Sequence, residues 1–297
     1  MKKFEGMVAA MVTPFHKDES LNLEEAARLV KHLFTKGLDG VLVGGSTGEY
    51  NLMSMDERKA LIKCAAEAAK GFDGYLIGGA SCYRTRDTVE MARYAGETGA
   101  DFVLVLPPYY LTTSRQGIID YFSEIADNTK ARVIIYNFPL GTNVYIEPEL
   151  LVELGKHPNI AGVKNTADME HTLKLIQLNG HNEKFKICNG YEHLFLATLA
   201  CGGDACMGIV QNIVPAQLAE MYRLTQANDF KAASLINEKL VPLYNFQKSE
   251  DSPFPGPVKY ALEIQGFSVG LPRKPVTPIS EEFKEKYRAI LKGAGVI

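Results

Sequence analysis

Short apolar runs rich in β-branched residues recur along the chain, separated by segments with helical spacing. Parallel strands need a long crossover connection, usually a helix, so strands that alternate with helices predict a parallel sheet. The runs do not alternate strictly between apolar and polar residues, which is typical of strands covered on both faces. Eight runs are found: "GMVAAMVT" (6–13), "GVLVGG" (40–45), "GYLIGGA" (74–80), "DFVLVLP" (101–107), "RVIIYN" (132–137), "IAGVKN" (160–165), "FKICNG" (185–190) and "DACMGIV" (204–210).

Their number and spacing favour a closed barrel. Eight such β-α units suit a (β/α)₈ TIM barrel, which typically has about 250 residues. A doubly wound open sheet is the alternative, but no G-x-G-x-x-G motif follows the first run to support a dinucleotide site. We therefore predict an α/β protein with a TIM-barrel catalytic domain at residues 1–228.

The remainder of the chain, residues 229–297, contains no run typical of a strand. Helical patterns occupy 230–246, 258–267 and 281–294, and "SPFPGP" and "GLPRKPVTP" interrupt them. This pattern predicts a C-terminal helical extension packed on the barrel.

One helix start is signalled with particular clarity. Ser54 and Glu57 in "SMDE" fit a capping box, in which each side chain accepts a hydrogen bond from the other residue's backbone N–H. A helix is expected to follow directly.

Charge and cysteine usage narrow the class of partner. The formal net charge is −3, with 32 basic and 35 acidic residues interspersed, so we expect neither a nucleic-acid nor a membrane partner. The first residues lack the pattern of a signal peptide or anchor. Five cysteines without C-x-x-C spacing fit a reducing cytoplasm, and six scattered histidines form no metal-ligand spacing, so no metal is predicted.

Lys164 ends an apolar run, which is an unusual place for a charged residue. TIM barrels carry their chemistry at the C-terminal ends of the strands, so the Lys164 amine would lie in the barrel mouth. Burial there favours the neutral amine, which can attack a ketone to form a Schiff base. The alternative is a lysine whose stem is buried and whose charge reaches solvent.

The stretch "GGSTGE" (44–49) follows the second run. Its glycines, Gly48 among them, permit a tight turn whose N–H groups can face an anion, and Ser46 and Thr47 add hydroxyl donors. A carboxylate would fit such a turn. A tight turn without a ligand is the alternative.

Tyr136 ends the fifth run, beside the strand of Lys164, and its phenol could move a proton to and from a substrate. A barrel-lining aromatic is the alternative. Tyr109 and Tyr110, in "PPYY" after the fourth run, lie on the same predicted rim, where they could equally contact another subunit.

Later strand ends supply candidates for the rest of the pocket. Glu192 and His193 follow "CNGY" and would bind substrate hydroxyls or act as a base, although an ordinary helix start is the alternative. Met207 and Ile209, from the eighth run, would wall the pocket with apolar groups.

The motifs "MVTPF", "GGSTGE", "PPYY", "YNFP", "GVKNT" and "GGDACMGI" occur in this order along the chain. Together they resemble the class I, Schiff-base-forming pyruvate aldolases, the family that contains N-acetylneuraminate lyase and dihydrodipicolinate synthase. The resemblance covers nearly the whole chain. It implies a TIM barrel with C-terminal helices, a homotetramer, and neither a metal nor an organic cofactor.

Residue by residue, the resemblance implies that Lys164 forms the Schiff base with pyruvate or another 2-keto acid and that Tyr136 is the proton shuttle. Ser46 and Thr47 would hold the pyruvate carboxylate. Ser46 would also link Tyr136 to Tyr109 or Tyr110 of a neighbouring subunit.

The choice of substrate depends on other positions. The chain resembles the sialic acid lyases at "GGSTGE", at Thr166 in "KNT" and at "NGYE", which starts with Asn189 and Gly190. We therefore expect four residues to bind the tail of the substrate, the part beyond its pyruvate unit: Thr166, Gly190, Glu192 and His193. Departures from those lyases occur at His193 and at Ile209, where they have an acidic residue and a serine.

Dihydrodipicolinate synthases usually have an arginine two residues after the proline of "YN-x-P", where it binds the second substrate's carboxylate. This chain has Gly141 there, so a charge-assisted contact is missing. The main hypothesis is a lyase that cleaves an N-acetylneuraminate-like or 2-keto-3-deoxy sugar acid reversibly to pyruvate and an aldehyde. The alternatives are 4-hydroxy-tetrahydrodipicolinate synthase, which condenses pyruvate with aspartate semialdehyde, and a non-catalytic 2-keto-acid-binding barrel.

Overall fold

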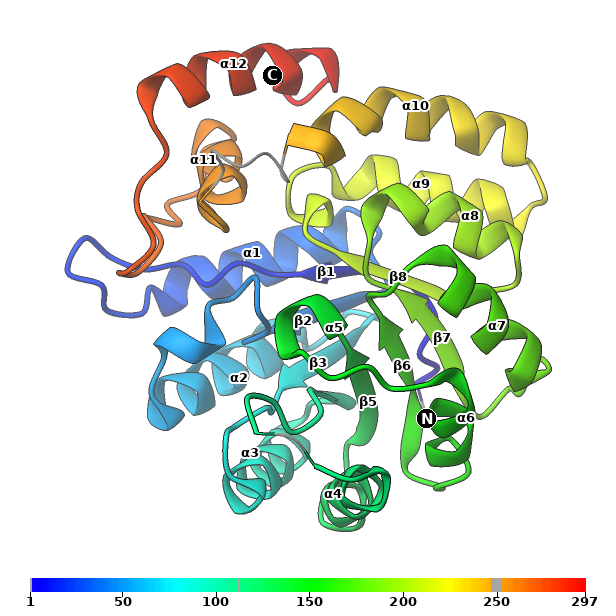
Figure 1. Ribbon diagram of the computed structural model, residues 1–297. Helices are drawn as coiled ribbons and strands as arrows, with labels where there is room; N and C mark the ends of the chain where they lie inside the picture. Colours follow the sequence, from blue (N-terminus) through cyan, green and yellow to red (C-terminus); the bar gives the residue numbers. More distant parts are fainter. Residues whose placement is uncertain (1, 112, 247–252) are drawn as a thin grey trace. The chain divides into compact units, whose positions relative to one another are not determined.

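A closed barrel of eight parallel strands, β1 to β8 in sequence order, forms the centre of the computed structural model (Figure 1). The structure describes residues 2–111, 113–246 and 253–297. Closure confirms the predicted TIM barrel and excludes an open doubly wound sheet, which would have two edge strands. The strands are β1 (Gly6–Ala10), β2 (Gly40–Val43), β3 (Tyr75–Gly79), β4 (Phe102–Val105), β5 (Arg132–Asn137), β6 (Ile160–Asn165), β7 (Lys186–Asn189) and β8 (Ala205–Gly208).

Each strand lies within one of the predicted runs, and nearly all strand residues are buried. Six runs extend beyond their strands, and for two of them a local reason is visible. Gly44 has a φ of +66° and begins a turn directly after β2. Pro107 follows β4 by two residues, and its ring nitrogen has no N–H to donate to a neighbouring strand.

The chain divides into two compact units. The first comprises Met1–Gly6 and Tyr75–Met207, and the second comprises Met7–Gly74 and Gly208–Ile297.

In the first unit, helices lie between successive strands from β3 onward. Its core is formed by strand residues with almost no exposed surface, such as Val103, Ile134 and Val163. The helices are α3 (Thr85–Thr98), α4 (Arg115–Asp127), α5 (Pro139–Thr142), α6 (Pro148–Leu154), α7 (Met169–Asn179) and α8 (Phe195–Ala200), with a 3₁₀ turn, η2 (Glu192–Leu194).

The C-terminal ends of β5, β6 and β7 are in register. Tyr136 pairs with Lys164, and Asn137 with Asn165, between β5 and β6. Asn165 pairs in turn with Asn189 between β6 and β7. The parallel register therefore brings residues far apart in sequence to the same edge of the sheet.

The second unit contains β1 from Met7 onward, β2 and the remaining described helices, including the expected C-terminal helical extension. Ser54 and Glu57 form the predicted capping box at the start of α2. The division of the chain at residue 228 stays a prediction. The helices are α1 (Leu23–Thr35), α2 (Met55–Ala69), α9 (Pro215–Gln226), α10 (Phe230–Phe246), α11 (Gly256–Ile264) and α12 (Glu281–Gly293), with 3₁₀ turns η1 (Tyr50–Leu52) and η3 (Val210–Asn212).

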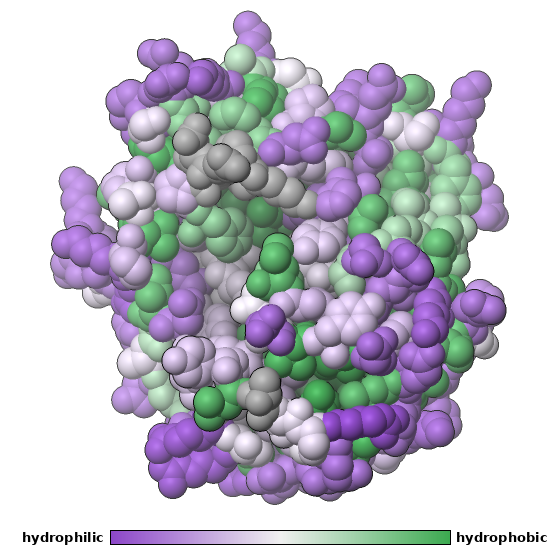
Figure 2. Space-filling model, in the orientation of Figure 1, coloured by the Kyte–Doolittle hydropathy of each residue, from purple (hydrophilic) through white to green (hydrophobic). Residues whose placement is uncertain are grey.

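Charged side chains on the solvent-facing sides of the helices produce the hydrophilic areas of the surface in Figure 2. Among the described residues, none of the helices has both the length and the apolar character needed to cross a bilayer.

Candidate active site

Lys164 lies one residue before the end of β6, and only 6% of its surface is exposed. Its Nζ atom lies 4.4 Å from the centroid of the Tyr136 ring on the neighbouring strand. Tyr136 is equally buried, so a desolvated amine faces the π-surface of a phenol. The sequence predicted the ends of neighbouring strands for these two residues, and the contact of the amine with the ring is an addition from the structure.

A chain of buried amides fixes the strand ends around this pair. Asn137 Nδ2 donates to Asn165 Oδ1 at 2.8 Å, and Asn165 Nδ2 donates to Thr172 Oγ1 at 3.0 Å. Asn189 Nδ2 donates to Thr198 Oγ1 at 2.9 Å. No role was predicted for these side chains, although a shared signal was available, since β5, β6 and β7 end in "YN", "KN" and "CN".

Thr166 places an unsatisfied hydroxyl beside Lys164. Its Oγ1 is buried and has no hydrogen-bond partner among the residues that the structure describes. A Cβ atom added to Gly190 would approach Thr166 Oγ1 to 2.0 Å and Lys164 Cε to 3.0 Å. Gly190 therefore leaves room for both side chains, and the Thr166 hydroxyl is available to a polar substrate group.

Tyr191, Glu192 and His193 follow β7 and differ in exposure. Glu192 is buried, whereas His193 is exposed, and its ring centroid lies 5.4 Å from that of Tyr191. Burial raises the pKa of Tyr191, and the charges of Tyr136 and Glu192 add to the rise. Glu192 is thus electrostatically coupled to Tyr191, while His193 faces solvent.

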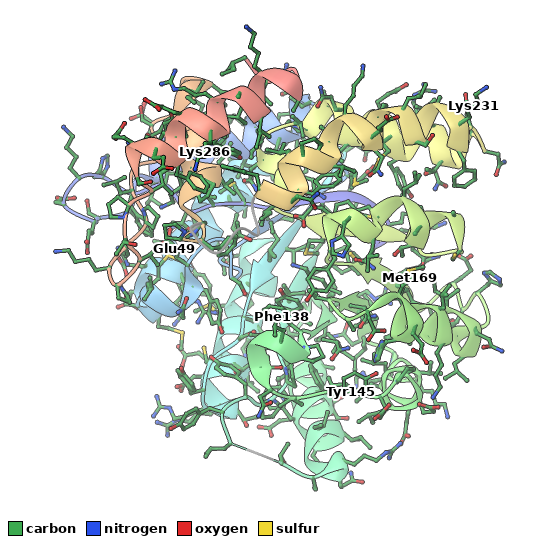
Figure 3. All side chains as sticks on the ribbon, turned by 45° about the horizontal axis from the view of Figure 1, so that its top comes forward. Glu49, Phe138, Tyr145, Met169, Lys231 and Lys286 are labelled. Atoms are coloured by element: carbon green, nitrogen blue, oxygen red, sulfur yellow. The ribbon has the colours of Figure 1, made fainter. Side chains whose placement is uncertain are left out.

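Phe138 is an aromatic neighbour that our sequence argument did not assign to the site. Its ring is stacked on that of Tyr136, with centroids 5.6 Å apart and an interplanar angle of 6°. Figure 3 shows Phe138 where β5 ends and α5 begins. A Cβ atom at Gly141 would lie 2.3 Å from the Phe138 ring, so this ring occupies the space next to residue 141.

Two further buried residues lie one position before the ends of β7 and β8. Cys188 pairs with Lys164 across β6 and β7, and its complete burial raises the thiol pKa well above the ordinary value. It therefore remains a protonated thiol near neutral pH. Met207 is fully buried on β8.

Tyr109 and Tyr110 lie on the loop after β4. The Tyr109 ring packs against Tyr83 with centroids 5.0 Å apart. Tyr110 is 90% exposed and has a φ of +74°, a left-handed conformation that is uncommon for a bulky residue. The loop thus presents one tyrosine to solvent.

The second unit holds the "GGSTGE" turn. Thr13 Oγ1 donates to the Gly48 carbonyl at 2.6 Å, and the Glu49 N–H donates to the Ser46 carbonyl at 3.1 Å. Thr47 is buried and Ser46 is half-buried. Ile209, half-buried, lies directly after β8 in the same unit.

The described residues include no group of three or more His, Cys, Asp or Glu side chains arranged to hold a metal ion. The fold and the residues at the strand ends define a (β/α)₈-barrel enzyme with a buried lysine amine beside a tyrosine.

Comparison with known proteins identifies the family. Residues 3–294 match the model of the Dihydrodipicolinate synthetase family, and the chain belongs to that family. It is an enzyme of the class I, pyruvate-dependent, carbon–carbon lyase type.

Similar proteins cover the whole chain. A 4-hydroxy-tetrahydrodipicolinate synthase of Acidiphilium cryptum is 34% identical, with 99% of each chain covered. The crystal structure of the dihydrodipicolinate synthase of Acinetobacter baumannii, complexed with pyruvate, matches with a TM-score of 0.93 at 30% identity, covering 99% of this chain and 100% of that one.

A second similar structure is that of YagE, a prophage protein of the dihydrodipicolinic acid synthase family from E. coli K12, also in complex with pyruvate. It has a TM-score of 0.93 and 27% identity, with 99% of each chain covered.

Proposed function

We propose that the Lys164 amine attacks the ketone of pyruvate and, with loss of water, forms a protonated imine. Loss of a C3 proton then gives an enamine, whose C3 adds to the carbonyl carbon of an aldehyde while the carbonyl oxygen takes up a proton. Hydrolysis of the new imine releases the 2-keto product and the free amine. In the reverse direction the same steps cleave the C3–C4 bond.

One observation carries this proposal: the Lys164 amine is buried against the Tyr136 ring, with Nζ 4.4 Å from its centroid. Tyr136 is the group we assign to proton transfer at the aldehyde oxygen and at the carbinolamine. Ser46 and Thr47 are assigned to the substrate carboxylate.

As the aldehyde we propose aspartate semialdehyde, which would make the reaction that of a 4-hydroxy-tetrahydrodipicolinate synthase. The names of the relatives described above support this assignment. It was the alternative in our sequence argument, and the comparisons favour it over the sugar acid lyase that we ranked first.

A sugar acid aldolase is retained as the second candidate because of residue 141. With glycine there, this position supplies no cation for a second carboxylate, and the stacked Phe138 ring fills the adjacent space. The unpartnered Thr166 hydroxyl is suited to a hydroxyl-bearing tail.

The lysine assignment is tested by borohydride reduction in the presence of pyruvate, followed by peptide mass spectrometry. We expect one pyruvyl adduct, on the peptide that contains Lys164. In Lys164→Ala we expect no adduct and a loss of turnover of at least about 10³-fold, since the covalent nucleophile is gone. Lys174→Met, which removes an exposed lysine of α7, is the control and should behave as the wild type. An adduct that persists in Lys164→Ala would refute the proposal.

The aldehyde is tested by comparing kcat/KM for pyruvate with aspartate semialdehyde against kcat/KM for uncharged hydroxyaldehydes, including N-acetylmannosamine and glyceraldehyde. A preference of at least about tenfold, equivalent to about 1.4 kcal/mol, would decide between the candidates. Preference for aspartate semialdehyde supports the synthase. Preference for a hydroxyaldehyde supports the second candidate.

A homotetramer and a cytoplasmic location are further proposals. The exposed Tyr110 supports a subunit contact on the loop after β4. Sedimentation of the wild type and Tyr110→Ser would test it, with a smaller assembly expected for the variant.

A further inference from the structure

Glu49, the last residue of the "GGSTGE" turn, is buried with a positive partner. Its Oε1 lies 2.7 Å from Lys259 Nζ, and each side chain is only 2% exposed. Glu49 has a φ of +57°, a left-handed conformation that is uncommon outside glycine. In Figure 3 the labelled Glu49 lies beside the segment that joins α11 to α12.

Lys259 comes from α11, in the C-terminal extension. Its Nζ also donates to the Leu271 carbonyl at 3.1 Å and lies 4.3 Å from the Phe15 ring centroid. Burial lowers the pKa of Lys259, and the charge of Glu49 opposes this shift. A buried ion pair is costly to desolvate and is often no more stable than an apolar pair of similar volume. Stability alone is therefore a weak explanation for the Glu49–Lys259 pair.

Arg273 binds the second carboxylate oxygen of Glu49. Its backbone N–H donates to Glu49 Oε2 at 2.8 Å, so both oxygens of Glu49 contact the C-terminal extension. The Arg273 guanidinium is anchored in turn: it donates to the Leu52 carbonyl at 2.7 Å, pairs with Glu57 and covers the Phe15 ring at 4.3 Å. The Glu49 side chain is thereby fixed at both oxygens.

The other side of the turn is closed by β1 and the residues after it. Thr13 Oγ1 donates a hydrogen bond to the Gly48 carbonyl at 2.6 Å. A Cβ atom on Gly48 would lie 3.0 Å from Thr13 Oγ1 and 3.1 Å from the Met11 carbonyl oxygen. Ser46 and Thr47 thus lie on a loop held at one end by Glu49 and along its side by Thr13.

We infer that Lys259 and Arg273 are positioning residues: through Glu49, the C-terminal extension holds the Ser46–Thr47 segment in the conformation that binds the substrate carboxylate. This inference rests on the proposed function, which assigns the carboxylate to that segment. It gives the extension a role in substrate binding.

The test is Lys259→Met, which keeps the stem and removes the charge. We expect KM for pyruvate to rise about tenfold, equivalent to about 1.4 kcal/mol, with a smaller change in kcat because Lys164 and Tyr136 are unaltered. The discrimination between pyruvate and pyruvamide, which lacks the carboxylate charge, should shrink by the same factor in borohydride trapping. Lys286→Met, at an exposed lysine of α12, is the control and should change neither quantity.

A second variant separates positioning from stability. Glu49→Gln/Lys259→Met removes both charges, keeps a side-chain oxygen that can accept from the Arg273 N–H, and should recover much of the melting temperature lost in Lys259→Met, since no unpaired charge remains buried. We expect KM for pyruvate to stay raised in this double variant. A wild-type KM with normal discrimination in either variant would overturn the inference. Trapping on Lys164 at saturating pyruvate must persist in both variants, and its absence in the wild type would overturn the proposed function instead.

Discussion

Gly190 shows how a residue without a side chain can shape a reactive site. The nearest atoms to its missing Cβ are those of Thr166 and Lys164, two residues assigned to the substrate. Any larger residue would have to displace the hydroxyl or the lysine stem. The "NGYE" motif gave a reason to look at Gly190, but only the fold showed which side chains depend on it.

At this position we predict that Gly190→Ala lowers kcat/KM for pyruvate by about 10²-fold, because displacing a reacting group by about 1 Å has an effect of that order. Steady-state kinetics and the rate of borohydride trapping on Lys164 measure the effect. Gly293→Ala, where nothing lies within 4 Å of the new methyl group, is the control and should have wild-type kinetics. Unchanged trapping in Gly190→Ala would show that Lys164 tolerates the methyl group.

At the scale of the element, α2 combines a local start signal with a long-range contact. The capping box of Ser54 and Glu57 follows from four consecutive residues. The same Glu57 carboxylate pairs with Arg273, which lies more than 200 residues later. The first interaction is readable from sequence, and the second depends on how the C-terminal extension packs.

The pH dependence of this pair is predictable. The Arg273 hydrogen bond lowers the pKa of Glu57 in the folded state. The stabilisation of the folded state by the Glu57–Arg273 pair is therefore complete above the ordinary glutamate pKa, about 4.3. It is lost as the pH falls through the lowered pKa of Glu57 in the folded protein. Glu57→Gln, which still fits a capping box, should reduce the free energy of unfolding by about 1 kcal/mol at pH 7. Urea unfolding from pH 7 to pH 3 should show the difference from wild type shrink toward the acid end; a constant difference would contradict the prediction.

At the scale of the whole molecule, the barrel depends on close approach between strands. A Cβ atom on Gly162 of β6 would lie 2.2 Å from the Lys186 carbonyl oxygen on β7, a contact with backbone that cannot be relieved by a rotamer change. The glycine in "IAGVK" is therefore a packing requirement two residues before the reactive lysine.

We predict that Gly162→Ala reduces the free energy of unfolding by about 1–3 kcal/mol, the usual effect of overpacking a core. Gly293→Ala, at the end of α12, should leave stability unchanged or slightly raised. Thermal and urea unfolding of the two variants measure the contrast. Equal stabilities would show that β6 and β7 can separate locally at little cost.

The sequence alone determined the barrel, the strand ends that carry Lys164 and Tyr136, and the α2 capping box, because these depend on periodicity and on neighbouring residues. It did not reveal the Phe138 stack on Tyr136, the unpartnered Thr166 hydroxyl beside Gly190, or the burial of Glu49 with Lys259. The Thr166–Gly190 contact depends on strand register, the Glu49–Lys259 pair depends on the packing of the C-terminal extension, and the Phe138 stack depends on how the chain turns after β5. No local pattern encodes such contacts, so the tertiary structure alone decided them.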